Sequence, residues 1–254
     1  GQYIPTFWPV RVPNDVLTEA DYEIMMNGNV RIGMYAPDFE AQTTMGNIKL
    51  SDYKGKWIVL FSHPGDFTPV CTSEFMTFAK MEPQFNEVNC KLVGLSIDGL
   101  YSHIAWLRTI KDKIDYKGMK DIEIKFPLIE DVSMHVAKLY GMVQPGESET
   151  QAVRAVFFID PKGIIRTILY YPLSLGRNFD EIKRVLMGLQ TADNFGVALP
   201  ADWRPGDDVI VPTAGSCGVA KERMDNKTGE LTCYDWFFCT RKLSKEEVES
   251  KLGK

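Results

Sequence analysis

The sequence predicts an α/β fold in which a mixed central sheet is flanked by helices, followed by a small C-terminal domain. Residues 57–98 pass from an apolar run to a helical pattern and back to an apolar run, which indicates a parallel strand–helix–strand unit. Residues 154–171 hold two apolar, β-rich runs around a turn at 160–163, which is typical of a hairpin. From about residue 194 the chain is rich in proline and glycine, so a second domain is expected there.

The first 62 residues are predicted to lead from an arm into the sheet. Residues 1–29 contain three prolines near the start, and a short helix over Thr18–Met26 is expected with Thr18 as its N-cap. A strand pair with a turn at residues 45–47 then precedes a buried strand over Trp57–Phe61. We find no residues suited to catalysis in the arm.

The buried strand is followed by a helix, predicted over Thr72–Val88, that a break or kink at Pro83 would interrupt. Cys71 therefore lies at or near the first turn of this helix. A second buried strand, Lys91–Asp98, completes the unit.

The remaining elements of the main domain alternate between helices and strands. A helix over residues 102–114, with Ser102 as a possible cap, precedes a brief strand at 126–131 and a capped helix over 133–141. The hairpin and an amphipathic helix over 178–193 follow. We expect three regions: an arm (1–29), an α/β domain (30–193) and a C-terminal domain that mediates dimerisation (194–254).

Composition and charge exclude several classes of protein. The chain of 254 residues has a formal net charge of −5 and a pI near 5.4, which argues against nucleic-acid binding. It has no apolar run long enough to span a membrane and no secretory signal, so a cytoplasmic protein is expected. Five cysteines, an odd number, do not suit a secreted disulfide scaffold. The nearest pair has C-x5-C spacing with no histidine after it, so neither a metal nor another cofactor is predicted.

Cys71 is the predicted nucleophile. The first N–H groups of a helix are unpaired and carry the positive end of its dipole, so a thiol placed there ionises more easily. The thiolate is the reactive form. A buried, inert cysteine is the alternative, but the neighbouring turn residues and the hydroxyl of Thr68 favour reactivity.

Residues 64–71, PGDFTPVC, match the P-x-x-x-T-x-x-C motif of the peroxiredoxins. The stretches FSHPGDFTPVCTSEF, LSID, LYYPLSLGRNFDEI and LPADWRPGDDVIVP resemble the peroxiredoxin-6-like (one-Cys) branch, in particular archaeal and bacterial members with extra C-terminal cysteines. The resemblance runs from about Val30 to the C-terminus. It implies a thioredoxin-like fold and a thiol-dependent peroxidase.

The resemblance implies a role for each matching residue of the motif. Cys71 resembles the peroxidatic cysteine, which becomes a sulfenic acid when it reduces the peroxide. Thr68 resembles the threonine whose hydroxyl accepts a hydrogen bond from the peroxide, and Pro64 the proline that shields the site from water. Arg154 resembles the arginine that stabilises the thiolate and the polarised O–O bond.

The resemblance implies secondary roles in the active site for two further residues. His63 matches a histidine close to the site, which either tunes the thiolate or holds the loop. Arg177 matches a second active-site arginine. The other two histidines, His103 and His135, fall on predicted helices, and we interpret both as structural.

The resemblance also suggests how the sulfenic acid is resolved. Cys239 resembles the cysteine that attacks the sulfenic acid of a neighbouring subunit, and Cys233 is the second candidate. If the segment between them is extended, their sulfurs lie roughly 20 Å apart and cannot pair directly without a turn. Cys90 and Cys217 match no catalytic position and are expected to be inert.

The expected function is reduction of hydrogen peroxide and organic hydroperoxides, with recycling by a thioredoxin- or glutaredoxin-like dithiol. A homodimer that assembles into a ring, often of ten chains, is implied by the family. A peroxide sensor or a ring-forming chaperone that uses the same cysteine is the alternative. Lipid hydrolysis is rejected, because the stretch IKLSDYKGKWIV has neither a G-x-S-x-G elbow nor a histidine.

Overall fold

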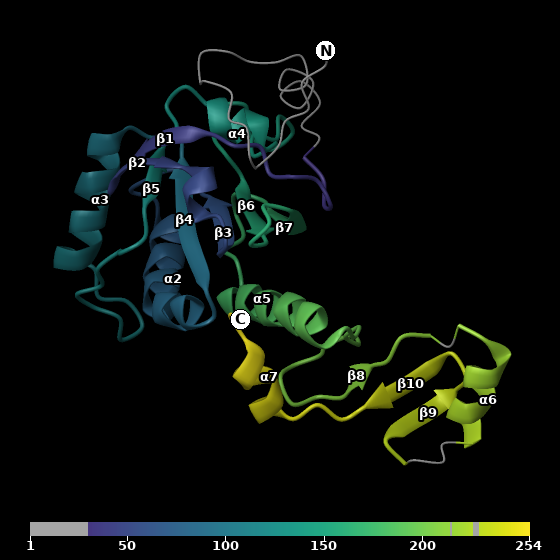
Figure 1. Cartoon of the computed structure of the whole chain (residues 1–254). Coiled ribbons are helices and arrows are strands. Elements are labelled where there is room, and N and C mark those ends of the chain that lie inside the picture. The colour runs from purple at the N-terminus through teal and green to yellow at the C-terminus, as the bar shows by residue number, and fades with distance from the viewer. Residues whose placement is uncertain (1–29, 214, 226–228) are drawn as a thin grey trace, which may run out of the picture. The chain divides into compact units, whose positions relative to one another are not determined.

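The computed structural model describes residues 30–213, 215–225 and 229–254 (Figure 1). The chain divides into two compact units, with the boundary between Phe179 and Asp180. The predicted arm and its Thr18–Met26 helix lie outside the described residues. No helix within the described residues is both long enough and apolar enough to cross a bilayer.

The described part of the first unit is built on a seven-stranded mixed sheet in the order β2-β1-β5-β4-β3-β6-β7. The three inner strands β3, β4 and β5 are parallel, and the other pairs are antiparallel. This confirms the predicted α/β fold with a mixed sheet. The strands are β1 (Glu40–Thr43), β2 (Gly46–Lys49), β3 (Trp57–Ser62), β4 (Cys90–Ser96), β5 (Leu128–Glu130), β6 (Arg154–Ile159) and β7 (Ile165–Tyr171).

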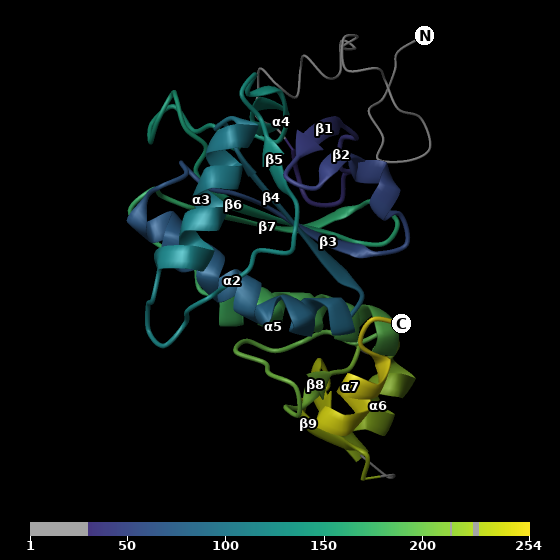
Figure 2. The same cartoon turned by 90° about the vertical axis from the view of Figure 1, so that its left-hand side faces the viewer.

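The helices of this unit differ from the prediction at their ends. Figure 2 shows α2 and α3 in front of the sheet. Helix α2 begins at Pro69 and continues through Pro83 to Glu87, so the expected break at the proline does not occur. Its early start follows from Pro69, because the fixed φ of proline suits the first position of a helix. The helices are η1 (Leu50–Tyr53), α2 (Pro69–Glu87), α3 (Leu100–Lys113) and α4 (His135–Leu139).

The ends of two helices differ in part from the prediction: Ser102 does not cap α3, whereas at α4 the Ser133 hydroxyl accepts from the His135 N–H at 3.3 Å and a carboxylate adds further contacts. Helix α3 starts after Gly99, and the Ser102 hydroxyl instead donates to the Asp66 carboxylate at 2.9 Å. At α4 the Asp131 carboxylate accepts from the backbone N–H groups of Val136 and Ala137, at 3.1 and 2.8 Å. By accepting hydrogen bonds from the first N–H groups of α4, the Asp131 carboxylate caps this helix.

The two faces of the sheet bury different side chains, as strand alternation requires. Ile58 and Leu60 of β3 belong to a core cluster that also contains residues of α4. Phe61 points to the other face, where its ring contacts Phe75 and Phe78 of α2, with centroids 5.7 and 4.7 Å apart. These aromatic contacts fix α2, and with it Cys71, against the carboxyl end of β3.

The second unit contains α5 (Phe179–Phe195), which spans the boundary, and a three-stranded sheet in the order β8-β10-β9. One core cluster of this unit consists of the buried residues Trp203, Val209, Leu243 and Val248. Most of α5 groups with this unit because Arg184 donates to the Trp203 carbonyl and Asn194 to the Lys251 carbonyl. The other elements are β8 (Val209–Ile210), α6 (Cys217–Asp225), β9 (Leu231–Asp235), β10 (Phe238–Arg241) and α7 (Lys245–Lys251).

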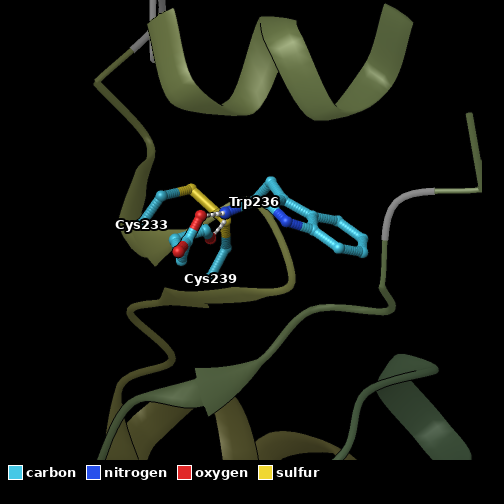
Figure 3. Close-up of a disulfide and its surroundings, with 4 residues drawn as sticks. Cys233, Trp236 and Cys239 are labelled. Carbon is cyan, nitrogen blue, oxygen red and sulfur yellow. Dashed lines mark hydrogen bonds between the residues drawn. A yellow bond between two sulfur atoms is a disulfide. The ribbon is translucent and has the colours of Figure 1, made fainter. Parts of the chain in front are cut away.

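Cys233 and Cys239 form a disulfide, which corrects the expectation that they are too far apart (Figure 3). The intervening segment is not extended: β9 and β10 make an antiparallel hairpin that turns at Trp236 and Phe237. The two cysteines are therefore opposite each other across the hairpin, with their Cα atoms 4.1 Å apart. The sequence has no glycine or asparagine at this turn, so it carries no hairpin signal there.

Candidate active site

Cys71 is a free thiol on the third residue of α2, and its side chain is completely buried. The chain reaches it from β3 through residues 63–68, a loop in which Phe67 adopts a positive φ of 57°. A non-glycine residue in this conformation is uncommon and forms part of a tight turn. The turn places the thiol at the positive end of the α2 dipole.

Thr68 and Pro64 lie in the loop that leads to Cys71. Thr68 is the N-cap of α2, but its hydroxyl donates to the Gly65 carbonyl at 2.7 Å instead of capping the helix. A hydroxyl has one hydrogen, so Thr68 Oγ1 is left to act as an acceptor toward any further partner. Pro64 is buried.

Arg154, the first residue of β6, brings its guanidinium to the thiol. Its Nη1 donates to Cys71 Sγ at 3.2 Å and to Glu74 Oε1 at 2.6 Å. Its Nε and Nη2 both donate to the Leu173 carbonyl, at 2.9 and 2.7 Å. The guanidinium is therefore held by Glu74 and by the Leu173 carbonyl, and its Nη1 also donates to the Cys71 sulfur.

Glu74, one helical turn after Cys71, joins Arg154 to Arg177. Both the backbone N–H and Nε of Arg177 donate to Glu74 Oε2, at 2.9 and 2.7 Å, and Nη2 donates to Oε1 at 3.0 Å. Burial by itself raises the pKa of the Glu74 carboxyl, but the two arginines outweigh burial, and the pKa is lowered. Glu74 is thus an anion between two cations.

Glu74 is not among the site residues predicted from the sequence. It lies three residues after Cys71 and is therefore on the same face of α2, a face that is otherwise apolar. A carboxylate at such a position needs a cation, and Arg154 and Arg177 were the available candidates. The two arginines and one carboxylate leave one positive charge, which a Cys71 thiolate would balance.

His63 belongs to a second buried cluster. Its Nε2 contacts Asp66 Oδ1 at 2.8 Å, and His103 Nδ1 contacts Asp66 Oδ2 at 2.6 Å. The cluster lies beside α2, because the His63 ring packs against Phe75 with centroids 4.8 Å apart. No hydrogen bond joins His63 to Cys71 among the described residues.

One group of described residues brings possible metal ligands together: His63, Asp66 and Asp98, with ligand atoms within 4.8 Å. These carboxylates already have partners in the fold. Asp98 Oδ2 accepts from the Asp66 backbone N–H and from the Ser96 hydroxyl, at 2.9 and 2.6 Å. The group is therefore accounted for by loop structure.

The remaining cysteines occupy different environments. Cys90 begins β4 and is buried, and burial raises the pKa of its thiol well above the usual range. Cys217 is exposed at the start of α6. Cys239 is 1% exposed, while Cys233 is partly exposed, and both belong to the hairpin of the second unit. Cys71, Arg154 and Arg177 thus lie together in the first unit. Cys233 and Cys239 belong to the second unit.

Two family models match the chain. Residues 32–168 match the AhpC/TSA family, and residues 188–227 match the C-terminal domain of 1-Cys peroxiredoxin. A peroxiredoxin of Methanosarcina mazei is 60% identical over 212 residues, which cover 83% of this chain and 97% of that protein. A peroxiredoxin of Aquifex aeolicus is 49% identical over 224 residues, covering 84% and 97%.

Solved structures agree with the sequence matches. A yeast mitochondrial 1-Cys peroxiredoxin, studied for thiol resolution via glutathione/thioredoxin systems, aligns with a TM-score of 0.73 and 40% identity over 85% of this chain and all of that one. A cysteine-to-serine mutant of peroxiredoxin 6 from Arenicola marina also aligns with a TM-score of 0.73, at 33% identity, covering 85% of this chain and 99% of that one.

Proposed function

Because this chain belongs to the peroxiredoxin family, and is therefore a thiol-dependent peroxidase, we propose that Cys71 is the residue that reduces the peroxide. The observation that carries the proposal is the 3.2 Å contact between Arg154 Nη1 and Cys71 Sγ in a buried site. A cation that is charged at every relevant pH favours the thiolate over the thiol. Hydrogen peroxide and organic hydroperoxides are the proposed substrates.

The reaction consumes one peroxide and oxidises one sulfur. The Cys71 thiolate attacks an oxygen of the peroxide, the O–O bond breaks, and the leaving oxygen takes a proton to become water or an alcohol. Cys71 becomes a sulfenic acid. Arg154 stabilises the charge that moves from sulfur to the leaving oxygen, Thr68 accepts from the peroxide O–H, and Pro64 excludes water. Arg177 acts through Glu74 to orient Arg154.

We assign resolution of the sulfenic acid to the C-terminal hairpin. The Cys239 thiolate attacks the sulfenic sulfur of a neighbouring subunit, which releases water and forms a Cys71–Cys239 disulfide. Cys233, opposite Cys239 in the hairpin, then displaces Cys71 and leaves the Cys233–Cys239 disulfide. A thioredoxin- or glutaredoxin-like dithiol reduces this disulfide and returns the enzyme to its starting state.

Attack between subunits requires an oligomer. We propose a homodimer that assembles further into a ring, as members of this family commonly do, in the cytoplasm. Light scattering on the purified protein checks the assembly. A monomer with full peroxidase activity would refute resolution between subunits.

The experiment that tests the proposed function is peptide mapping after one equivalent of hydrogen peroxide. Cys233→Ser should accumulate a dimer linked by a Cys71–Cys239 peptide, because the second exchange is blocked. Cys239→Ser should form no such link and should over-oxidise at Cys71. Wild type should consume many equivalents of peroxide when a dithiol is recycled, whereas a peroxide sensor or chaperone would stop after about one.

A further inference from the structure

The Leu173 carbonyl holds one edge of the Arg154 guanidinium. It accepts from Nε at 2.9 Å and from Nη2 at 2.7 Å, while Nη1 donates to Cys71 Sγ at 3.2 Å. A guanidinium is planar and rigid, so two hydrogen bonds to one oxygen fix the direction in which the group points. The distance between Nη1 and the sulfur therefore depends on where the Leu173 backbone lies.

Leu173 lies in the irregular segment between β7, which ends at Tyr171, and α5, which begins at Phe179. The ladder between β6 and β7 also ends at Tyr171, so it does not fix the Leu173 backbone. The Leu173 side chain is partly buried and packs against the core cluster, which keeps the residue in place but leaves its peptide groups free to turn. The Leu173 N–H donates to Glu147 Oε1 at 2.8 Å, and this hydrogen bond sets the orientation of the backbone.

Glu147 belongs to the loop between α4 and β6, residues 140–153. The loop is closed at its base, where the Val153 N–H donates to the Met142 carbonyl at 2.8 Å and both residues are buried. Within the loop, the Glu147 N–H donates to the Gln144 carbonyl at 2.9 Å. Glu147 itself is exposed, but it reaches Leu173 from a turn that is held by its own hydrogen bonds and that begins and ends in the core.

We propose that Glu147 is a positioning residue for peroxide reduction: by fixing the Leu173 backbone, it holds the Arg154 guanidinium at hydrogen-bond distance from the Cys71 sulfur. This inference rests on the proposed function, in which Cys71 is the reacting residue. The negative charge of Glu147 is not what the role requires, because loss of a negative charge near the site would by itself favour the thiolate. Loss of the acceptor, by contrast, releases the Leu173 backbone and lets Nη1 move away from the sulfur.

Two substitutions separate the acceptor from the charge. Glu147→Ala removes both, whereas Glu147→Gln removes the charge and keeps an acceptor, because the amide oxygen of glutamine also accepts. Stopped-flow oxidation of Cys71 by hydrogen peroxide should slow by about 10-fold in Glu147→Ala and stay within about 2-fold of wild type in Glu147→Gln, since a small displacement of a catalytic group is costly. Alkylation of Cys71 by iodoacetamide, followed by peptide mapping as a function of pH, should have its midpoint at higher pH in Glu147→Ala, because a displaced Arg154 stabilises the thiolate less.

A double-mutant cycle tests whether Glu147 acts through Arg154. In an Arg154→Ala background the group that Glu147 positions is gone, so adding Glu147→Ala should lower the oxidation rate no further. A second loss as large as that in Glu147→Ala alone would mean that the two residues act independently, and it would overturn the proposal. A general loss of stability would lower the rate in both backgrounds, so the cycle distinguishes positioning from a merely structural role.

Glu149→Ala is the matched control. Glu149 is an exposed glutamate of the same loop whose side chain makes no hydrogen bond or ion pair with the described residues, so both measurements should be unchanged. A wild-type rate in Glu147→Ala overturns the proposal, and so does a Glu147→Gln variant that is as slow as Glu147→Ala. Alkylation of Cys71 needs no turnover, so these outcomes are separate from failure of the proposed peroxidase function, which Cys71→Ser tests.

Discussion

Glu74→Gln is the substitution that tests how Arg154 is held against the thiol. Glu74 is 2% exposed and accepts from Arg154 Nη1 and from three N–H groups of Arg177, at distances between 2.6 and 3.0 Å. A glutamine keeps the shape but loses the charge, and one of its two terminal atoms donates. Two guanidinium groups then remain buried without their common anion.

The loss of this buried anion determines how much stability and activity Glu74→Gln should lose. Removing one partner of a buried ion pair typically costs about 3–5 kcal/mol, so the free energy of unfolding should fall by about 3 kcal/mol or more. Because Arg154 loses one of its anchors, we also expect the rate of Cys71 oxidation to fall by about 10²-fold, the usual loss for one misplaced donor. Urea unfolding measures the first quantity and stopped-flow fluorescence with hydrogen peroxide the second.

The chain supplies a matched control for Glu74→Gln. Glu181 pairs with Arg184 on α5, where the two side chains are 36% and 27% exposed. Glu181→Gln should change the free energy of unfolding by at most about 1 kcal/mol and leave the oxidation rate unchanged. If Glu74→Gln behaved like this control, the argument that Glu74 positions Arg154 would be refuted.

Three other predictions follow from the described contacts. Thr68→Val, which removes the acceptor but keeps the shape, should slow Cys71 oxidation by about 10²–10³-fold in stopped-flow measurements, and an unchanged rate would remove Thr68 from the mechanism. Gly94→Ala should lower stability by about 1–3 kcal/mol in urea unfolding, because an added Cβ lies 3.1 Å from the Phe61 ring and 3.2 Å from Leu128; a neutral result would mean that the ring can move aside. Glu74 has a lowered pKa in the folded protein, so the stability it contributes is present above its unfolded value of about 4.5 and is lost as pH falls through the folded value; urea unfolding of Glu74→Gln should show a weaker loss of stability over this acid range than wild type.

The order of strands and helices in the first unit could be predicted because each depends on a local pattern. The apolar run of β3, the β-rich runs of β6 and β7 and the spacing in α2 are signals within single segments. The start of helix α7 also has a local signal, because Ser244 and Glu247 form a capping box. Local patterns thus predict most of the strands and helices of the first unit.

The site was only partly predictable, because its contacts join residues far apart in the chain. Arg154 meets Glu74 across 80 residues, and His103 meets Asp66 across 37. Helical periodicity shows His103 on a buried face but does not show which carboxylate lies opposite, so the sequence favoured a structural role. The hairpin of Cys233 and Cys239 was missed for another reason, since aromatic residues at its turn give no turn signal.

The two buried clusters beside α2 are built differently. In one, the Asp66 carboxylate lies between the imidazoles of His63 and His103, and it has no arginine or lysine partner among the described contacts. Glu74 cancels only one of Arg154 and Arg177, so this cluster presents an excess positive charge at sulfur. A buried net charge is costly unless a counterion lies close to it. In the proposed mechanism the Cys71 thiolate is that counterion, so Arg154 and Arg177 favour the form of the cysteine that attacks the peroxide.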